Sequence, residues 1–166
     1  MKKSVGLLAV LLSVSPWASG ERPGDDLKPL VSAGEWVSPK AQNIRFTLEP
    51  GDYYSGMVVF NCAKTEKKIR LIAVPSGAER IREISQDQPV QWKVKVVSKG
   101  GEFTGELIGG GGRLPDLLIS PAAPWLKALG EDGDHFNLVI DGTESYQIPT
   151  SQLIATTIAS CSPPIS

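Results

Sequence analysis

The sequence predicts a mainly β protein: an antiparallel β-sandwich or partly open barrel with two short helices and one disulfide. Short runs of apolar residues, several alternating with polar ones, are separated by turns rich in Gly, Pro and Asp. The regular succession of strand and helix that builds a parallel sheet is absent. The chain has only two cysteines, Cys62 and Cys161, and both follow an N-terminal export signal.

Residues 1–20 have the three parts of a secretory signal peptide. Lys2 and Lys3 form a charged start, a ten-residue apolar stretch follows, and small residues end at Gly20. A membrane anchor is the alternative, but a spanning helix needs about 20 apolar residues. We therefore expect a cleaved signal, a periplasmic or secreted product, and no membrane span in the mature chain.

The mature chain of 146 residues has the length of one domain. We expect residues 21–42, rich in Pro, Gly, Asp and Ser, to form an N-terminal arm whose apolar residues dock as a short strand or cover one end of the core. Residues 43–166 are expected to form a single β-rich domain. Without Lys2 and Lys3, 15 basic side chains stand against 18 acidic ones, so nucleic acid is an unsuitable partner.

The first expected strands lie before residue 75. Ile44, Phe46 and Leu48 alternate with polar residues, as a half-buried strand requires. Residues 57–62 form a denser apolar run, typical of a strand covered on both sides. Residues 69–74 form the next strand, which Pro75 and the following Ser-Gly end.

The clearest alternation follows residue 89. Val90, Trp92, Val94 and Val96 predict a strand with one dry face, and residues 102–108 return as its hairpin partner. Residues 117–119 are a short apolar segment, and the alternation of Phe136, Leu138 and Ile140 predicts another strand. The charged residues 78–88 fit either one helical turn or an exposed loop.

Two helices are expected late in the chain. Pro124 suits a first helical position, and Gly130 a position just past the helix end. The last helix opens at Pro149 or Thr150. Its buried face consists of residues at helical spacing: Ile154, Ile158 and Cys161.

Two cysteines allow one intramolecular pairing, Cys62 with Cys161. An export signal favours a structural disulfide. Two buried free thiols or a redox pair are the alternatives, although redox cysteines are usually closely spaced, as in C-x-x-C.

No catalytic, cofactor or metal motif stands out, and we expect none. His135 is the only histidine and has no nucleophile elbow to serve. The acidic residues 131–134 lack the ligand spacing of an EF-hand and fit a solvated turn. The glycines 109–112 lack the Lys-Ser/Thr of a P-loop and fit a flexible connection. A glycosidase-like pair of carboxylates stays possible, but no spacing supports it.

Tyr53 and Tyr54 are the candidate binding residues. They lie between Gly51 and Gly56, and tyrosine offers a large contact area at low entropic cost. A structural role in closing one end of the core is the alternative.

A wider pattern carries a family resemblance. It consists of Phe60-Asn61-Cys62, Lys68-Ile69-Arg70-Leu71, the Trp92 strand, the segment Leu117 to Pro121, Phe136-x-Leu138 and a helix ending in Cys161. Over roughly residues 43–161 the chain resembles small periplasmic proteins associated with type VI secretion, the TagO or VasI family. It is similar in layout to invasion-associated locus B-type proteins.

The resemblance implies an accessory role at the cell envelope and brings no catalytic residue. We therefore expect a non-enzymatic binding protein with a protein or envelope partner. An immunity or inhibitor protein that blocks a toxin or hydrolase is the second hypothesis, and a cell-wall-acting enzyme is the third.

Overall fold

A computed structural model describes residues 30–31, 34–40, 43–48, 57–76, 82–84, 86, 89–131 and 133–161. Within these residues ten strands form a single sheet. The strands are β1 (Leu30–Val31), β2 (Trp36–Lys40), β3 (Asn43–Thr47), β4 (Met57–Ala63), β5 (Lys68–Val74), β6 (Pro89–Ser98), β7 (Gly101–Gly110), β8 (Arg113–Ile119), β9 (His135–Ile140) and β10 (Glu144–Pro149). Two helices, α2 (Pro124–Ala128) and α3 (Gln152–Cys161), and a helical turn at residues 82–84 accompany them.

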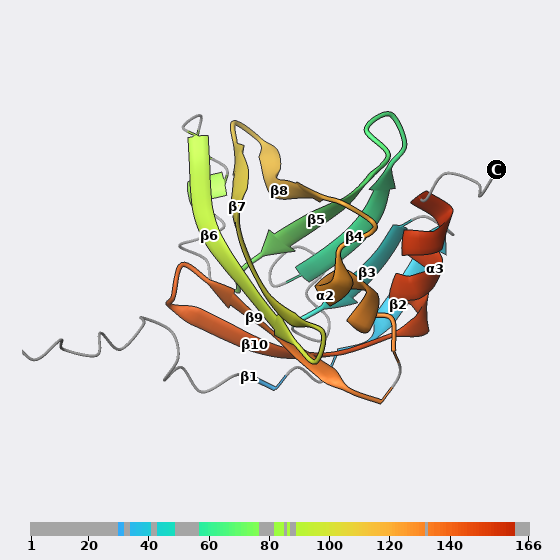
Figure 1. The fold of residues 1–166 in the computed structure, drawn as a ribbon. Helices are drawn as coiled ribbons and strands as arrows, with labels where there is room; N and C mark the ends of the chain where they lie inside the picture. The colour runs from blue at the N-terminus through green and yellow to red at the C-terminus, as the bar shows by residue number, and fades with distance from the viewer. Residues whose placement is uncertain are drawn as a thin grey trace, which may run out of the picture.

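The sheet curls into a partly open barrel, as Figure 1 shows. The strand order is β1-β10-β9-β6-β7-β8-β5-β4-β3-β2, and every pairing except the short parallel one between β1 and β10 is antiparallel. The curl brings β2 to the end of β10, where the Trp36 indole Nε1–H donates to the Pro149 carbonyl at 2.7 Å. The predicted fold class is confirmed in its barrel form, since all strands belong to one sheet.

The core occupies the inside of this curl because inward and outward residues alternate along the strands. On β6, Trp92, Val94 and Val96 are buried, while Lys93 between them is exposed. The largest fully buried side chains include Phe46, Phe60, Leu71, Leu107 and Leu138. The alternation read from the sequence therefore names the correct inward residues.

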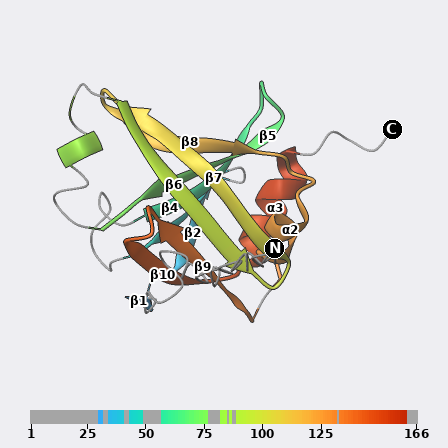
Figure 2. The same ribbon diagram turned by 60° about the vertical axis from the view of Figure 1, so that its left-hand side comes forward.

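The sheet splits where β7 meets β8. The two strands form a tight hairpin through Gly111 and Gly112, with φ of +61° and +79°, but they pair only at Ile108–Asp116 and Gly110–Arg113. Beyond that point β8 pairs with β5, whereas β7 stays with β6 along its whole length. Figures 1 and 2 both show the two strands diverging from the hairpin.

Helix α2 lies on the inner side of β7. Pro124 is at its start as predicted, and Trp125 stacks on Phe103 with ring centroids 4.6 Å apart. Gly130 follows the C-cap residue Leu129, which is the expected position just past the helix end. Its lack of a side chain matters for packing instead of for ending the helix. A Cβ on Gly130 would lie 2.7 Å from the Cβ of Ala155 in α3, so the glycine permits close packing of the two helical segments.

The end of the chain differs from the expectation in two respects. Residues 144–149 form β10, which the sequence reading missed, and the last helix begins at Gln152 instead of Pro149 or Thr150. Pro149 is tolerated because it is the last residue of the strand, opposite His135. The predicted inward face of the helix, Ile154, Ile158 and Cys161, is buried.

A candidate binding surface on the outer face of the sheet

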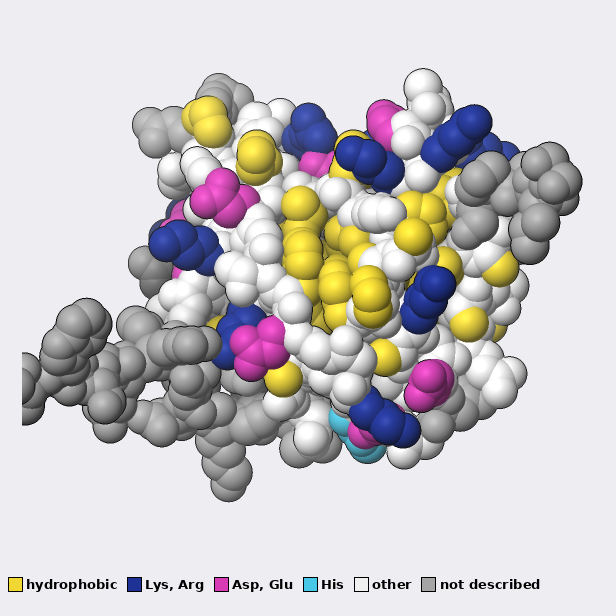
Figure 3. Space-filling view, viewed as in Figure 1, with side chains coloured by type: hydrophobic (Ala, Val, Ile, Leu, Met, Phe, Trp, Pro, Cys, Tyr) yellow, Lys and Arg dark blue, Asp and Glu magenta, His cyan; other side chains and the backbone are white. Residues whose placement is uncertain are grey.

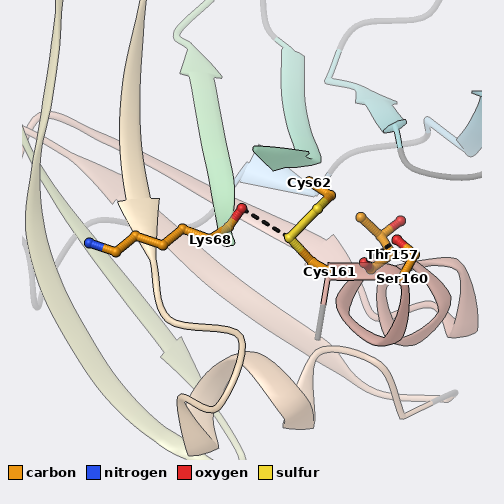
Figure 4. Close-up of a disulfide and its surroundings, with 5 residues drawn as sticks. All are labelled: Cys62, Lys68, Thr157, Ser160 and Cys161. Atoms are coloured by element: carbon orange, nitrogen blue, oxygen red, sulfur yellow. Dashed lines mark hydrogen bonds between the residues drawn. A yellow bond between two sulfur atoms is a disulfide. The ribbon is translucent and has the colours of Figure 1, made fainter. Parts of the chain in front are cut away.

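The predicted disulfide joins Cys62 in β4 to Cys161 at the end of α3 (Figure 4). Their Cα atoms are 5.3 Å apart, and the bridge spans 99 residues of sequence. The Cys161 sulfur lies 3.2 Å from the Lys68 carbonyl oxygen, a contact without a hydrogen bond because a disulfide sulfur carries no proton. The bridge ties α3 to the sheet and indicates folding in an oxidising compartment.

The predicted binding residues Tyr53 and Tyr54 lie outside the described residues. Their binding role stays a prediction. The strands on either side are described: β3 ends at Thr47, and β4 begins at Met57, opposite Val74 at the end of β5.

His135 and the acidic segment before it, considered above as a metal site, have structural roles in the described residues. His135 is exposed at the start of β9, and its backbone N–H donates to the Asp134 carboxylate at 2.8 Å. Asp134 is tied to Thr150 by backbone and hydroxyl hydrogen bonds. In the described part of the chain, no three His, Cys, Asp or Glu side chains gather as metal ligands would.

The glycine-rich segment is an ordered hairpin turn instead of the flexible connection that the composition suggested. Gly111 and Gly112 adopt the left-handed conformation that such a turn needs. The Gly111 N–H donates to the Gln86 carbonyl at 3.0 Å, so this amide already has an acceptor within the fold.

Among the described residues, three of the four exposed large apolar side chains lie on the outer face of β7 and β8, and the fourth is Val37 on β2. Ile108 on β7 is 53% exposed, and Leu114 and Leu118 on β8 are 38% and 36% exposed. Ile108 lies directly opposite Asp116, and the two leucines flank Asp116 along β8. We call these three side chains, with Asp116 at their centre, the β8 patch.

Two arginines neutralise the centre of this patch. Arg113 Nη2 lies 2.7 Å from one Asp116 carboxylate oxygen, and Arg70 Nε lies 3.0 Å from the other. The Asp116 side chain is only 9% exposed, whereas that of Arg113 is 68% exposed. The patch therefore presents apolar side chains around the Asp116 carboxylate, whose charge two guanidinium groups neutralise. These guanidinium groups lie at the rim of the patch.

A pocket of about 350 Å³ continues this outer face beyond the β8 patch. Its lining comes from three strands and a turn: Lys93, Val94 and Lys95 of β6, Thr104 of β7, Val139 of β9 and the turn Asp141-Gly142. The Asp141 carboxylate accepts the Lys93 backbone N–H at 2.7 Å, and Lys95 pairs with Glu102 at 3.6 Å. The outward side chains of β7 thus run from the pocket to the patch through Thr104, Glu106 and Ile108.

A partly buried polar cluster around Tyr146 joins β10 to Ser76, just past the end of β5. The Tyr146 hydroxyl donates to the Glu144 carboxylate and accepts from the Ser76 backbone N–H at 3.0 Å. The Ser76 hydroxyl lies 2.8 Å from the same oxygen and donates to it, since the tyrosine proton is directed to Glu144. Burial, followed by the hydrogen bond to Glu144, raises the pKa of Tyr146 to about 12.

This pKa predicts an alkaline loss of stability. An unfolded tyrosine ionises near pH 10, so between pH 10 and 12 only the folded state keeps the proton, and the free energy of unfolding falls as pH rises. The two-unit shift corresponds to about 2–3 kcal/mol. We expect urea unfolding of the wild type to lose that much more between pH 10 and 12 than Tyr146→Phe does. Equal slopes for the two proteins would contradict the assignment.

No family model, no curated protein and no solved structure matches the chain. Among the described residues, no helix is both long and apolar enough to cross a membrane.

Sequence reasoning missed the β8 patch and the pocket. Leu117–Ile119 was recognised as an apolar segment, but Leu118 alone of its three residues is exposed. The pattern that indicates the patch is the alternation along β8. Pro115 and Ile119 are buried on the inner face, so Asp116 and Leu118 point outward. That Ile108 lies opposite Asp116 depends on the register of the hairpin.

Proposed function

We propose that this protein is an exported, non-enzymatic binding or accessory domain of the cell envelope, acting in the periplasm, and that it holds a protein partner through the β8 patch. The observation that carries the proposal is the exposure of Ile108, Leu114 and Leu118 around the doubly paired Asp116. Contiguous apolar exposure of this kind marks interaction sites.

The apolar character of the patch has no role in the core. Leu107 and Ile119, the inward neighbours of Ile108 and Leu118, are buried, so the outward positions accept polar side chains without loss of core packing. A partner that covers the patch removes three large apolar side chains from water. Arginine is a common anchor at the centre and rim of protein interfaces, which suits Arg70 and Arg113.

Three further features support the envelope as the place of action. The first 20 residues have the pattern of an export signal, and the disulfide fits an oxidising compartment. The resemblance to periplasmic secretion-associated proteins points in the same direction.

The test is partner capture from the periplasm with the double variant Ile108→Lys plus Leu118→Lys. Both positions are outward-facing, so we expect the free energy of unfolding to change by less than about 1 kcal/mol. Capture is expected to fall at least tenfold, because two charges would be buried against the partner. The matched control is Glu66→Lys in the exposed turn after β4, which changes the net charge by the same amount.

Retained capture by the stable double variant would refute the patch as the binding surface. A captured toxin or hydrolase that loses activity in the complex would assign the inhibitor role in place of the accessory one. Hydrolysis of peptidoglycan by the purified protein, lost on changing one carboxylate, would overturn the non-enzymatic proposal.

A further inference from the structure

Strand β7 has a free edge where the sheet splits. Along the stretch from Glu102 to Glu106, the described residues include no strand paired to β7 on the side away from β6. Unpaired edges of this kind are templates for an added strand.

The hydrogen bonds of β6 show which backbone groups of β7 face this edge. The Asp141 N–H donates to the Lys93 carbonyl at 2.8 Å, and the Lys93 N–H donates to the Asp141 side chain, so the peptide groups of Lys93 face β9. The peptide groups of the alternate residues of β6 consequently point the other way, toward β7. Val94 and Val96 are two of these residues, and they pair with Gly105 and Phe103.

The backbone groups of the intervening β7 residues, Glu102, Thr104 and Glu106, therefore face away from β6. All three residues are exposed. Their N–H and C=O groups form a row of donors and acceptors along the edge.

An apolar surface lies beside this edge. Figure 3 shows hydrophobic side chains gathered in the angle between β7 and β8, next to α2. Phe103 and Leu117 are partly exposed there and pack on the core. A Cβ placed on Gly105 would touch both side chains, at 2.9 Å from Phe103 and 2.8 Å from Leu117, so the two side chains adjoin at the bare backbone of β7.

The charges on β7 select what can pair with it. Glu102 and Glu106 are exposed on the outer face on either side of Thr104. On the β6 side, Glu102 lies 3.6 Å from Lys95 and Glu106 accepts from the Gln91 amide at 2.7 Å, and each carboxylate keeps a second oxygen for a strand added on the other side. A second copy of β7 pairing antiparallel about Thr104 would set carboxylates opposite carboxylates, which is unfavourable. A strand with Lys or Arg at its outward positions would instead place opposite charges across the new pairing.

We propose that the free edge of β7 binds an extended peptide of the partner by strand addition. The peptide alternates apolar residues, which face Phe103 and Leu117, with basic residues, which face Glu102 and Glu106. Main-chain hydrogen bonds give such complexes their affinity, and the alternating side chains give their specificity. The inference rests on the proposed binding function and names the chemistry of its partner.

The first experiment uses the disulfide-bonded full chain and a labelled heptapeptide of alternating Lys and Val. The comparison peptide has the same composition with the Val residues in one block. We expect fluorescence anisotropy to give at least tenfold tighter binding for the alternating peptide. Equal affinities would overturn the proposal.

Two variants test the edge itself. Thr104→Pro removes an N–H that faces away from β6 and leaves the ladder to β6 intact, whereas Thr104→Val keeps the N–H and serves as the matched control. We expect Thr104→Pro to weaken binding at least tenfold and Thr104→Val to leave it within twofold. Glu102→Lys plus Glu106→Lys is expected to reverse the preference, toward an alternating Glu and Val peptide.

Amide exchange measured by NMR on the unaltered protein settles the mode even if the proline variant fails to fold. On saturation with the alternating peptide, the N–H groups of Glu102, Thr104 and Glu106 should exchange at least tenfold more slowly. Those of Phe103 and Gly105, already bonded to β6, are internal controls and should change little. Unchanged exchange at all three edge amides would exclude strand addition.

These outcomes are separable from the fate of the proposed function. If the lysine variants of the β8 patch abolish partner capture while the edge amides stay unprotected, the binding role stands and strand addition is wrong. If the edge binds peptide while the patch variants capture normally, the edge is a binding site on its own and the β8 patch is not.

Discussion

Replacing Cys62 and Cys161 by serine is expected to lower the free energy of unfolding by about 4–5 kcal/mol. The bridge closes a loop of 99 residues, which restricts the unfolded chain strongly. Since domains of this size are stable by only about 5–15 kcal/mol, this loss is a large share of the total. Chemical denaturation of the exported wild type and the double variant measures it.

The matched control is the wild-type protein unfolded in the presence of a reducing agent, which breaks the same bond without changing a residue. The free energies of unfolding of the reduced wild type and the double variant should agree within about 1 kcal/mol, since a serine side chain is close in size to that of cysteine. A double variant as stable as the oxidised wild type would show that α3 is held by packing alone. Two free thiols in periplasmic protein would remove the basis of the prediction.

Gly109→Ala is expected to destabilise the protein by about 3 kcal/mol, the upper end for inserting one extra group into a packed site. Its Cβ would lie 2.6 Å from the Pro115 nitrogen, 2.7 Å from the Pro115 Cα and 2.8 Å from the Arg113 carbonyl oxygen. All three are backbone atoms, so relief requires β7 and β8 to separate at the hairpin. Thermal and urea unfolding both report the change.

Gly105→Ala is the control for this substitution, because it adds the same methyl group to the same face of the same strand. Its Cβ would meet only the ends of two side chains, those of Leu117 and Phe103, which can turn aside. We expect a loss of no more than about 1 kcal/mol. Equal losses at both positions would mean that the hairpin backbone yields as easily as a side chain.

The local structure was largely predictable from the sequence, whereas the arrangement of its parts was not. Period-two alternation from Val90 to Val96 correctly named the buried face of β6, and the Cys62–Cys161 pair followed from there being two cysteines. Strand β10 was missed because it lies between a turn and an expected helix start, and Ser145 is buried beside Tyr146, which blurs its alternation.

The candidate surface depended on long-range pairing that no local pattern contains. Leu118 is next to Arg70 only because β8 leaves β7 and pairs with β5, and Asp116 consequently meets guanidinium groups from two strands. The polar cluster at Tyr146 likewise joins residues 70 positions apart. Tyr53 and Tyr54, chosen from composition, await a test of their own.

The hydrogen bond from the Trp36 indole to the Pro149 carbonyl reports whether β2 and the end of β10 stay together. The indole ring is packed against Phe46 at a centroid distance of 5.1 Å, and its N–H reaches across the seam to the last residue of β10. Any ligand or condition that separates β2 from β10 will break this hydrogen bond and expose the indole N–H to solvent. The resulting change in the Trp36 indole resonance gives a spectroscopic view of the seam while the rest of the sheet stays folded.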